Sequence, residues 1–227
     1  MTTIAAVFSA TSLAQEATDV YDRVDLSATA EREVENDTLI AIVYAEVEDN
    51  DQSDAADQVN RAISWAADQA RRIAGVDLQT MQYNTRPVYA SGSRRITGWI
   101  ARQSLRLESQ DAEALSELLG TLQERVAIQS TSYALSKEAR DAAEEALIAE
   151  ALARFNARAA LIARELDRRG HRIVRISIGT SGAFPMMYQE TIVTGARLRA
   201  DVAAPTVEAG VQTVSVSVNG TIELDAE

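Results

Sequence analysis

The 227-residue chain has no cysteine and a single histidine, His171, and these absences exclude several kinds of chemistry. Without cysteine the protein has no disulfide, no thiolate metal site and no cysteine nucleophile. His171 alone cannot complete a zinc site of the usual ligand types, and no Gly-x-Ser-x-Gly nucleophile elbow accompanies it. Since His171 follows a predicted helix, the helix dipole by itself explains a histidine there. We therefore expect no enzyme activity, no bound metal and no cofactor.

The chain is also poor in proline and glycine, with 3 and 10 residues respectively. Such a composition argues against long disordered linkers, and the hydrophobic fraction of 46% is ordinary for a globular protein. A body of this length can bury roughly 70% of the surface of its unfolded chain. We expect a mostly ordered domain over residues 18–227.

Acidic residues outnumber basic ones by 34 to 22, which gives a formal net charge of −12, and Lys137 is the only lysine. Such a protein on average repels phosphate backbones and anionic lipid headgroups, so we expect no nucleic acid partner. No apolar run approaches the ~20 residues that a membrane-spanning helix requires. The mature protein should therefore not cross a bilayer as a helix. A peripheral contact with the cell envelope is compatible with this sequence.

The N-terminus resembles the end of a secretory signal peptide. Residues 4–8 form a short apolar run, and Ser12-Leu13-Ala14 provides a small-x-small cleavage pattern. The positively charged region that begins such peptides is missing from Met1-Thr2-Thr3. We interpret residues 1–17 as a signal-like segment and expect a periplasmic or secreted bacterial protein after its cleavage.

Hydrophobic periodicity predicts an α+β fold in which antiparallel sheets are built from hairpins. Residues 24–34 and 39–47 alternate between apolar and polar side chains, as half-buried strands do, and a turn-rich segment lies between them. A helix follows, and residues 78–89 and 96–108 predict a second hairpin with another helix after it. The two hairpin–helix subunits suggested by this order are residues 24–75 and 78–126.

The third predicted helix is long, alanine-rich and amphipathic. It spans residues 136–169, with Ser136 as the N-cap and Gly170 as the C′ residue. Its apolar positions recur at steps of four and three, which predicts a heptad-like packing seam. The seam comprises Ile148, Leu152, Phe155, Ala159, Ile162 and Leu166.

The charges of this long helix are polarised, with acidic residues in its first half and arginines in its second. Matching of the helix dipole explains such an order, at ~0.3–1 kcal/mol per terminal charge. Pairing of acidic and basic halves between protomers also explains it, so both explanations stay open. The candidate protomer contact comprises Glu144, Glu145, Arg154, Arg158, Arg164 and Arg168.

The C-terminal part predicts two strands separated by an irregular segment. The strands are residues 173–178 and 211–224, and the second is continuous, with Gly220 facing inward. Glycines and prolines accumulate in residues 179–210, the most loop-like region of the chain. The candidate contact site for a small ligand or peptide in this region comprises Phe184, Met186, Met187 and Tyr188.

Several segments together resemble a known family, the SIMPL domain. They are Asp77-Leu78-Gln79-Thr80, Ile96-Thr97-Gly98-Trp99, the helix of residues 139–166, and Glu208-Ala209-Gly210 before a valine-rich strand. Many members have Pro-Asp where this chain has Asn36-Asp37, and a tyrosine where Trp99 stands. The resemblance covers nearly the whole chain, and it rests on the order and spacing of these segments.

The SIMPL family includes bacterial periplasmic immunogenic proteins and proteins labelled as oxidative-stress defence factors. The resemblance implies an exported α+β protein that tends to self-associate. It implies no established enzyme activity and no catalytic residues that could be transferred to this chain.

The first functional hypothesis is a non-enzymatic, exported envelope protein that forms a homo-oligomer, ring-like assemblies included, with a link to stress tolerance. The alternative is a periplasmic module that binds a small ligand or peptide through residues 179–210. A third hypothesis, an enzyme that uses carboxylates, requires two close acids with raised pKa values in one cleft.

Overall fold

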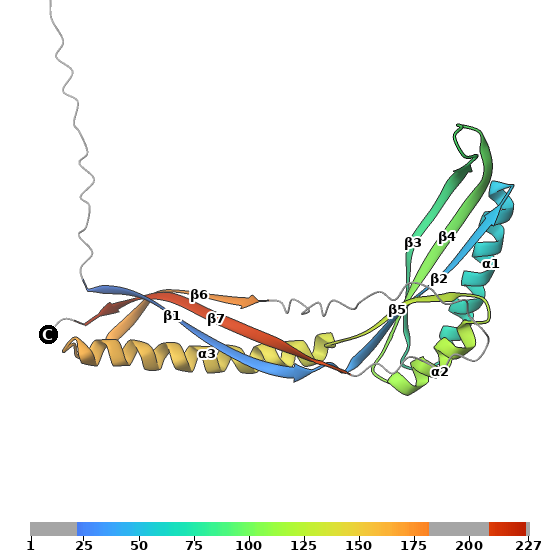
Figure 1. The fold of residues 1–227 in the computed structure, drawn as a ribbon. Helices are drawn as coiled ribbons and strands as arrows, with labels where there is room; N and C mark the ends of the chain where they lie inside the picture. Colours follow the sequence, from blue (N-terminus) through green and yellow to red (C-terminus); the bar gives the residue numbers. More distant parts are fainter. Residues whose placement is uncertain (1–21, 182–208, 226–227) are drawn as a thin grey trace, which may run out of the picture.

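The structure is a computed structural model that describes residues 22–181 and 209–225, and it has an α+β fold, as predicted. We name the sheet with strand order β1-β7-β6 the terminal sheet, and the sheet with order β3-β4-β2-β5 the central sheet. Helix α3 lies along the terminal sheet, whereas α1 and α2 lie against the central sheet (Figure 1). The elements are β1 (Arg23–Glu35), β2 (Thr38–Asp49), α1 (Gln52–Ala70), β3 (Asp77–Tyr89), β4 (Ile96–Ser109), α2 (Ala112–Leu122), β5 (Ala127–Ala134), α3 (Lys137–Glu165), β6 (His171–Ser181) and β7 (Val211–Leu224).

The predicted hairpin between residues 24–34 and 39–47 is wrong. Strand β1 pairs with β7 along its whole length, whereas β2 pairs with β4 and β5. The two residues between β1 and β2 do not reverse the chain, because Asn36 N–H donates to Gly210 O and Asp37 N–H to Ala134 O. The chain therefore passes directly from the terminal sheet into the central sheet at this point.

The second predicted hairpin is confirmed, since β3 and β4 pair antiparallel from Asp77 opposite Glu108 to Tyr89 opposite Ile96. Residues 24–75 do not form a subunit matching residues 78–126, because β1 belongs to the terminal sheet. Strands and helices of residues 38–134 instead share one core, in which the inner face of the central sheet packs against α1 and α2.

The core of the terminal sheet lies under α3. Alternate side chains of β1 and β7 point towards the helix, among them Ala28, Ala30, Val216 and Val218, and are buried. The buried side chains of α3 recur every four residues: Ala143, Leu147, Ala151, Phe155, Ala159 and Ala163.

The predicted heptad seam is therefore only partly correct. Phe155 and Ala159 are buried and Ile148 and Leu152 pack at the rim of the core, whereas Leu166 is 53% exposed. A row of residues four apart is inclined to the helix axis, and such a row follows a twisted sheet better than a straight seam does.

The start of α3 agrees with the sequence, and its end does not. Ser136 is the N-cap, because its Oγ accepts the Ala139 N–H at 3.2 Å. The helix ends at Glu165, and Asp167 takes the left-handed conformation that was expected of Gly170, with a φ of 54°. Arg168 N–H donates to Ala163 O and Asp167 N–H to Arg164 O, which together form a Schellman motif. An aspartate tolerates this backbone better than most side chains do, so the helix can end before the glycine.

Gly220 faces α3 in one continuous strand, as predicted. A Cβ at this position would lie 2.9 Å from Phe155 Cζ and 2.5 Å from Arg175 O. The absence of a side chain therefore lets the Phe155 ring rest directly on β7.

Candidate functional site

Residues 22–181 and 209–225 contain no group of three or more His, Asp or Glu side chains that could hold a metal ion. The lone histidine, His171, is the first residue of β6 and lies opposite Leu224. No helix of the described parts is long and apolar enough to cross a membrane.

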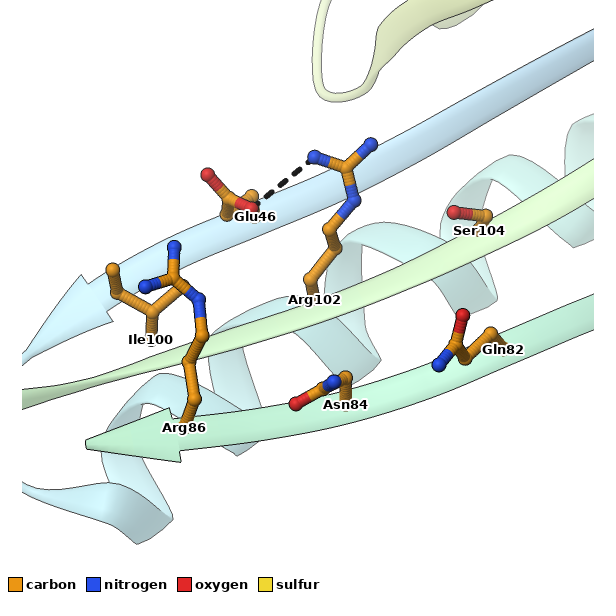
Figure 2. A pocket seen from close by; sticks show the side chains of 7 residues that line it. All are labelled: Glu46, Gln82, Asn84, Arg86, Ile100, Arg102 and Ser104. Atoms are coloured by element: carbon orange, nitrogen blue, oxygen red, sulfur yellow. Dashed lines mark hydrogen bonds and ion pairs between the residues drawn. The ribbon is translucent and has the colours of Figure 1, made fainter.

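A small hollow lies on the open face of the central sheet, lined by Glu46, Gln82, Asn84, Arg86, Ile100, Arg102 and Ser104 (Figure 2). Arg102 is already engaged there, since it donates to Glu46 Oε2 at 3.2 Å and to Gln129 Oε1 at 2.7 Å. Its guanidinium also lies 3.7 Å from the centroid of the Tyr44 ring. The volume is about 130 Å³, below the roughly 300 Å³ at which pockets for small organic ligands begin. We regard the hollow as a surface depression.

Asp37 holds the junction of the two sheets together. Its carboxylate accepts the Ser136 N–H and the Ser136 Oγ–H, both at 2.6 Å, and the Gln110 amide at 3.3 Å. Burial opposes ionisation of Asp37, but the hydrogen bonds from Ser136 and Thr38 outweigh it and lower the pKa of the carboxyl. The residue therefore acts as a fixed acceptor that ties the start of β2 to the start of α3.

Glu223 is a second carboxyl with a lowered pKa, and its cause is different. Hydrogen bonds from Arg172 and then Arg23, with the charges of both guanidinium groups, stabilise its ionised form. The two arginines come from β6 and β1, on either side of β7. The pair of contacts thus fastens the three strands of the terminal sheet at one end. Neither Asp37 nor Glu223 is the raised-pKa acid that the carboxylate-enzyme hypothesis requires.

The predicted protomer contact on α3 is only partly free. Arg154 donates to Thr29 O at 2.7 Å and to Glu150 Oε1 at 2.6 Å, and Arg158 donates to Ser27 O. The other two arginines bind Asp22 and Glu165 within the chain, whereas Glu144 is half-buried and Glu145 is exposed. Contact between protomers through these six residues stays a prediction, but the structure gives the arginines a role inside the fold.

The open side of β6 is the most unusual surface of the described residues. Its apolar side chains are partly exposed: Ile173 by 45%, Val174 by 43%, Ile176 by 39% and Ile178 by 43%. Ile176 lies opposite Gly220 and Ile178 opposite Val218, so both point to the side of the sheet where α3 lies. The helix packs mainly on β1 and β7 and only marginally on β6. We call these four side chains, with the free backbone edge beside them, the β6 surface.

Sequence reasoning placed a strand at residues 173–178 but missed its exposure. An available signal was the density of β-branched residues, since Ile173 and Val174 are adjacent and Ile176 and Ile178 follow closely. The other apolar candidate, with Phe184, Met186, Met187 and Tyr188, lies outside the described residues.

Several solved structures are distantly similar to parts of the chain. An amidohydrolase/peptidase from Burkholderia cenocepacia, described as putative in its own name, is 14% identical with a TM-score of 0.28, over 47% of this chain and 28% of that chain. The de novo designed protein Foldit4 is also 14% identical with a TM-score of 0.28, over 44% of this chain and 99% of that chain. An amidase of the hydantoinase/carbamoylase family from Burkholderia vietnamiensis is 9% identical with a TM-score of 0.27, over 44% of this chain and 27% of that chain.

These structural scores are too low to support an argument about fold or activity. No curated protein sequence matches the chain. A family comparison is decisive, because the SIMPL family, described as proteins of unknown function (DUF541), matches residues 24–222. The chain therefore belongs to the SIMPL family.

Proposed function

We propose that this protein is a non-enzymatic, exported envelope protein that self-associates into a homo-oligomer and contributes to stress tolerance. The observation that carries self-association is the β6 surface, where four large apolar side chains of one strand are 39–45% exposed. Large exposed apolar patches on a soluble protein mark interaction sites, and an uncovered strand edge adds unpaired backbone donors and acceptors.

Export is supported by the N-terminal residues, in which a short apolar run precedes Ser12-Leu13-Ala14. The resemblance to periplasmic members of the family points in the same direction, and it is also the basis for the link to stress tolerance. The shortage of catalytic groups in the described residues supports a role in assembly over one in chemistry.

Self-association is tested by native mass spectrometry and light scattering of the chain without residues 1–14, between 1 and 100 μM protein. We expect an oligomer that persists when the salt concentration is raised, because apolar contacts are screened little by salt. A monomer at every concentration would overturn the assembly part of the proposal.

Export is tested separately, by expressing the full chain in a Gram-negative host and sequencing the N-terminus of the accumulated protein. We expect the periplasmic fraction to contain a chain that begins near Gln15. A cytoplasmic chain that retains residues 4–8 would contradict export and leave self-association unaffected.

A further inference from the structure

The two sheets have four outer edges, and three of them carry a feature that hinders pairing with another strand. On β1, the carbonyl oxygens of Ser27 and Thr29 are occupied by Arg158 and Arg154. Strand β3 contains Pro87, which lacks an N–H, and has a register shift after Thr80. Strand β5 is short and its register also shifts against β2. Arginines, prolines and bulges are devices by which natural sheets protect their edges.

The fourth edge, on β6, is open in its second half. The register shift lies between Ile173 and Arg175, in the first half (residues 171–175), whereas the second half (residues 176–181) pairs with β7 without interruption. This half contains neither proline nor lysine, and no described strand pairs with its outer side. It is rich in β-branched side chains, which favour strand pairing.

Charge along β6 selects the direction in which a second copy of the strand can pair. The first half contains His171, Arg172 and Arg175, whereas residues 176–181 contain no charged side chain. An antiparallel copy places the basic half of each strand against the uncharged half of the other. A parallel copy would align arginine with arginine, and like charges directly opposite each other destabilise a strand pair.

We propose that two copies of this chain join β6 to β6 in antiparallel orientation, around a two-fold axis near Ser177–Gly179, and form one continuous six-stranded sheet. The proposal rests on the proposed self-association and specifies its surface and symmetry. The contact is isologous, because the only other edge of the terminal sheet, on β1, is occupied by arginines. Edge pairing therefore yields a closed pair, and a ring would require a further surface.

The register of this pairing is restricted by the side chains. Ile176 and Ile178 point to the α3 side of the sheet. If residues of the same parity lie opposite each other, the isoleucines of both copies and both α3 helices share one face. A shift by one residue would separate the isoleucines onto opposite faces and leave them in water. The axis therefore coincides with a residue position.

Cysteine cross-linking tests the contact, because the natural chain has no cysteine that could interfere. The variants are Ser177→Cys, Gly179→Cys and the double variant, and a Cβ at Gly179 would meet nothing closer than Ser217 Oγ at 3.4 Å. The matched control is Ser27→Cys, an exposed serine on the opposite edge strand. Under mild oxidation we expect disulfide-linked dimers from at least one β6 variant, in more than half of the chains, and less than a tenth of that amount from Ser27→Cys.

A second pair of variants compares two apolar side chains that are equally exposed to solvent but lie on different elements. Ile178 is 43% exposed on β6 and Leu161 is 44% exposed on α3. We expect Ile178→Lys to raise the dissociation constant of the dimer at least tenfold, and Leu161→Lys to leave it within twofold. Circular dichroism spectra of both variants check that they remain folded.

The outcomes separate this inference from the proposed function. If the natural chain is oligomeric but no β6 cysteine cross-links, or Ser27→Cys cross-links equally well, the β6 pairing is wrong and self-association stands. If the chain is monomeric, both proposals fail. If it is monomeric and the amide protons of residues 175–181 become protected only when a strand-forming peptide is added, the edge serves a peptide instead, which also overturns the pairing.

Discussion

The central and terminal sheets differ in how many strands each helix has to cover. An α-helix with its side chains is about 10 Å wide and neighbouring strands are about 4.8 Å apart, so one helix covers about two strands. The central sheet has four strands and two helices, whereas the terminal sheet has three strands and only α3. The third strand, β6, is consequently left with its isoleucines exposed.

This difference shows that an apolar strand can be exposed because its sheet has too few helices to cover it, and not because of the strand's own sequence. The protein protects β1 with two arginines from the same helix that fails to cover β6. The terminal sheet therefore has one occupied edge and one open edge.

The largest effect is expected from Phe155→Ala, which removes the largest fully buried side chain in the core between α3 and the terminal sheet. The substitution should lower the free energy of unfolding of this sheet by about 4 kcal/mol, because it leaves a cavity above Gly220. Both tryptophans, Trp65 and Trp99, lie in the central part. We expect the urea transition seen by far-ultraviolet circular dichroism to shift strongly, and the transition seen by tryptophan fluorescence to shift less.

The matched control is Leu105→Ala in the central core, where the side chain is 1% exposed. This substitution should move the fluorescence transition by about 3 kcal/mol. If each substitution shifts the circular dichroism and fluorescence transitions equally, the two sheets unfold as one unit. The expectation that their two cores unfold independently would then be wrong.

A smaller effect is expected from Asp37→Ala at the junction. The loss of the acceptor for Ser136 N–H and Oγ should lower stability by about 2 kcal/mol, the size typical of hydrogen bonds to a charged group. Asp37→Asn, which keeps one acceptor oxygen, should cost less. The urea midpoint at pH 7 measures the loss of stability in both variants. An unchanged midpoint for Asp37→Ala would show that the Asp37 contacts at the junction do not stabilise the fold.

The same residue predicts a dependence on pH. The folded-state pKa of Asp37 lies below its unfolded value of about 3.9, so the folded protein binds fewer protons than the unfolded chain in that range. The stability that Asp37 contributes is complete above the unfolded pKa and is lost as the pH falls through the folded pKa. The difference in urea midpoint between the natural chain and Asp37→Asn should therefore shrink between pH 5 and pH 2.5. Glu223→Gln serves as the surface control, since solvent screens its ion pairs and the corresponding change should be smaller.

The smallest effect on stability is expected from the double variant Arg154→Gln and Arg158→Gln. The lost contacts lie at the surface and should cost less than about 1 kcal/mol in total. The change in assembly should be larger, because the freed carbonyl groups of Ser27 and Thr29 open the β1 edge. Light scattering should then detect species larger than the natural oligomer, whereas Arg164→Gln, whose partner is the adjacent Glu165, should not produce them. An unchanged size would show that these arginines do not protect the edge.

Local features of the fold were predictable from the sequence, because their causes are local. The alternation in residues 211–224, the N-cap at Ser136 and the inward-facing Gly220 each depend on a few neighbouring side chains. The end of α3 was misplaced because an aspartate, and not the nearby glycine, adopts the left-handed conformation. The signal for a glycine C′ residue is a preference, and here Asp167 satisfies the same geometry.

Features that depend on distant partners could not be predicted. Asn36 and Asp37 look like a hairpin turn, and only Gly210 and Ala134, far along the chain, show that they connect two sheets. The exposure of β6 depends on which strands α3 covers, and the sequence of β6 does not contain that information. The junction and the β6 surface could therefore be recognised only in the three-dimensional structure.

The pairing of β1 with β7 also determines when each part of the protein can fold during synthesis. Residues 38–134 are contiguous and contain every strand of the central sheet, so all of its pairing partners are present as soon as this part has emerged. The strand that precedes it, β1, must wait for a partner whose last paired residue is Glu223, close to the end of the chain. Until β7 has been made, β1 has no strand to pair with, and its inward-facing Ala28 and Ala30 cannot be buried in the terminal sheet. A chain that ends before residue 211 lacks β7, the strand that lies between β1 and β6. The terminal sheet and its open edge therefore exist only in a chain that includes β7, because this strand lies between β1 and β6.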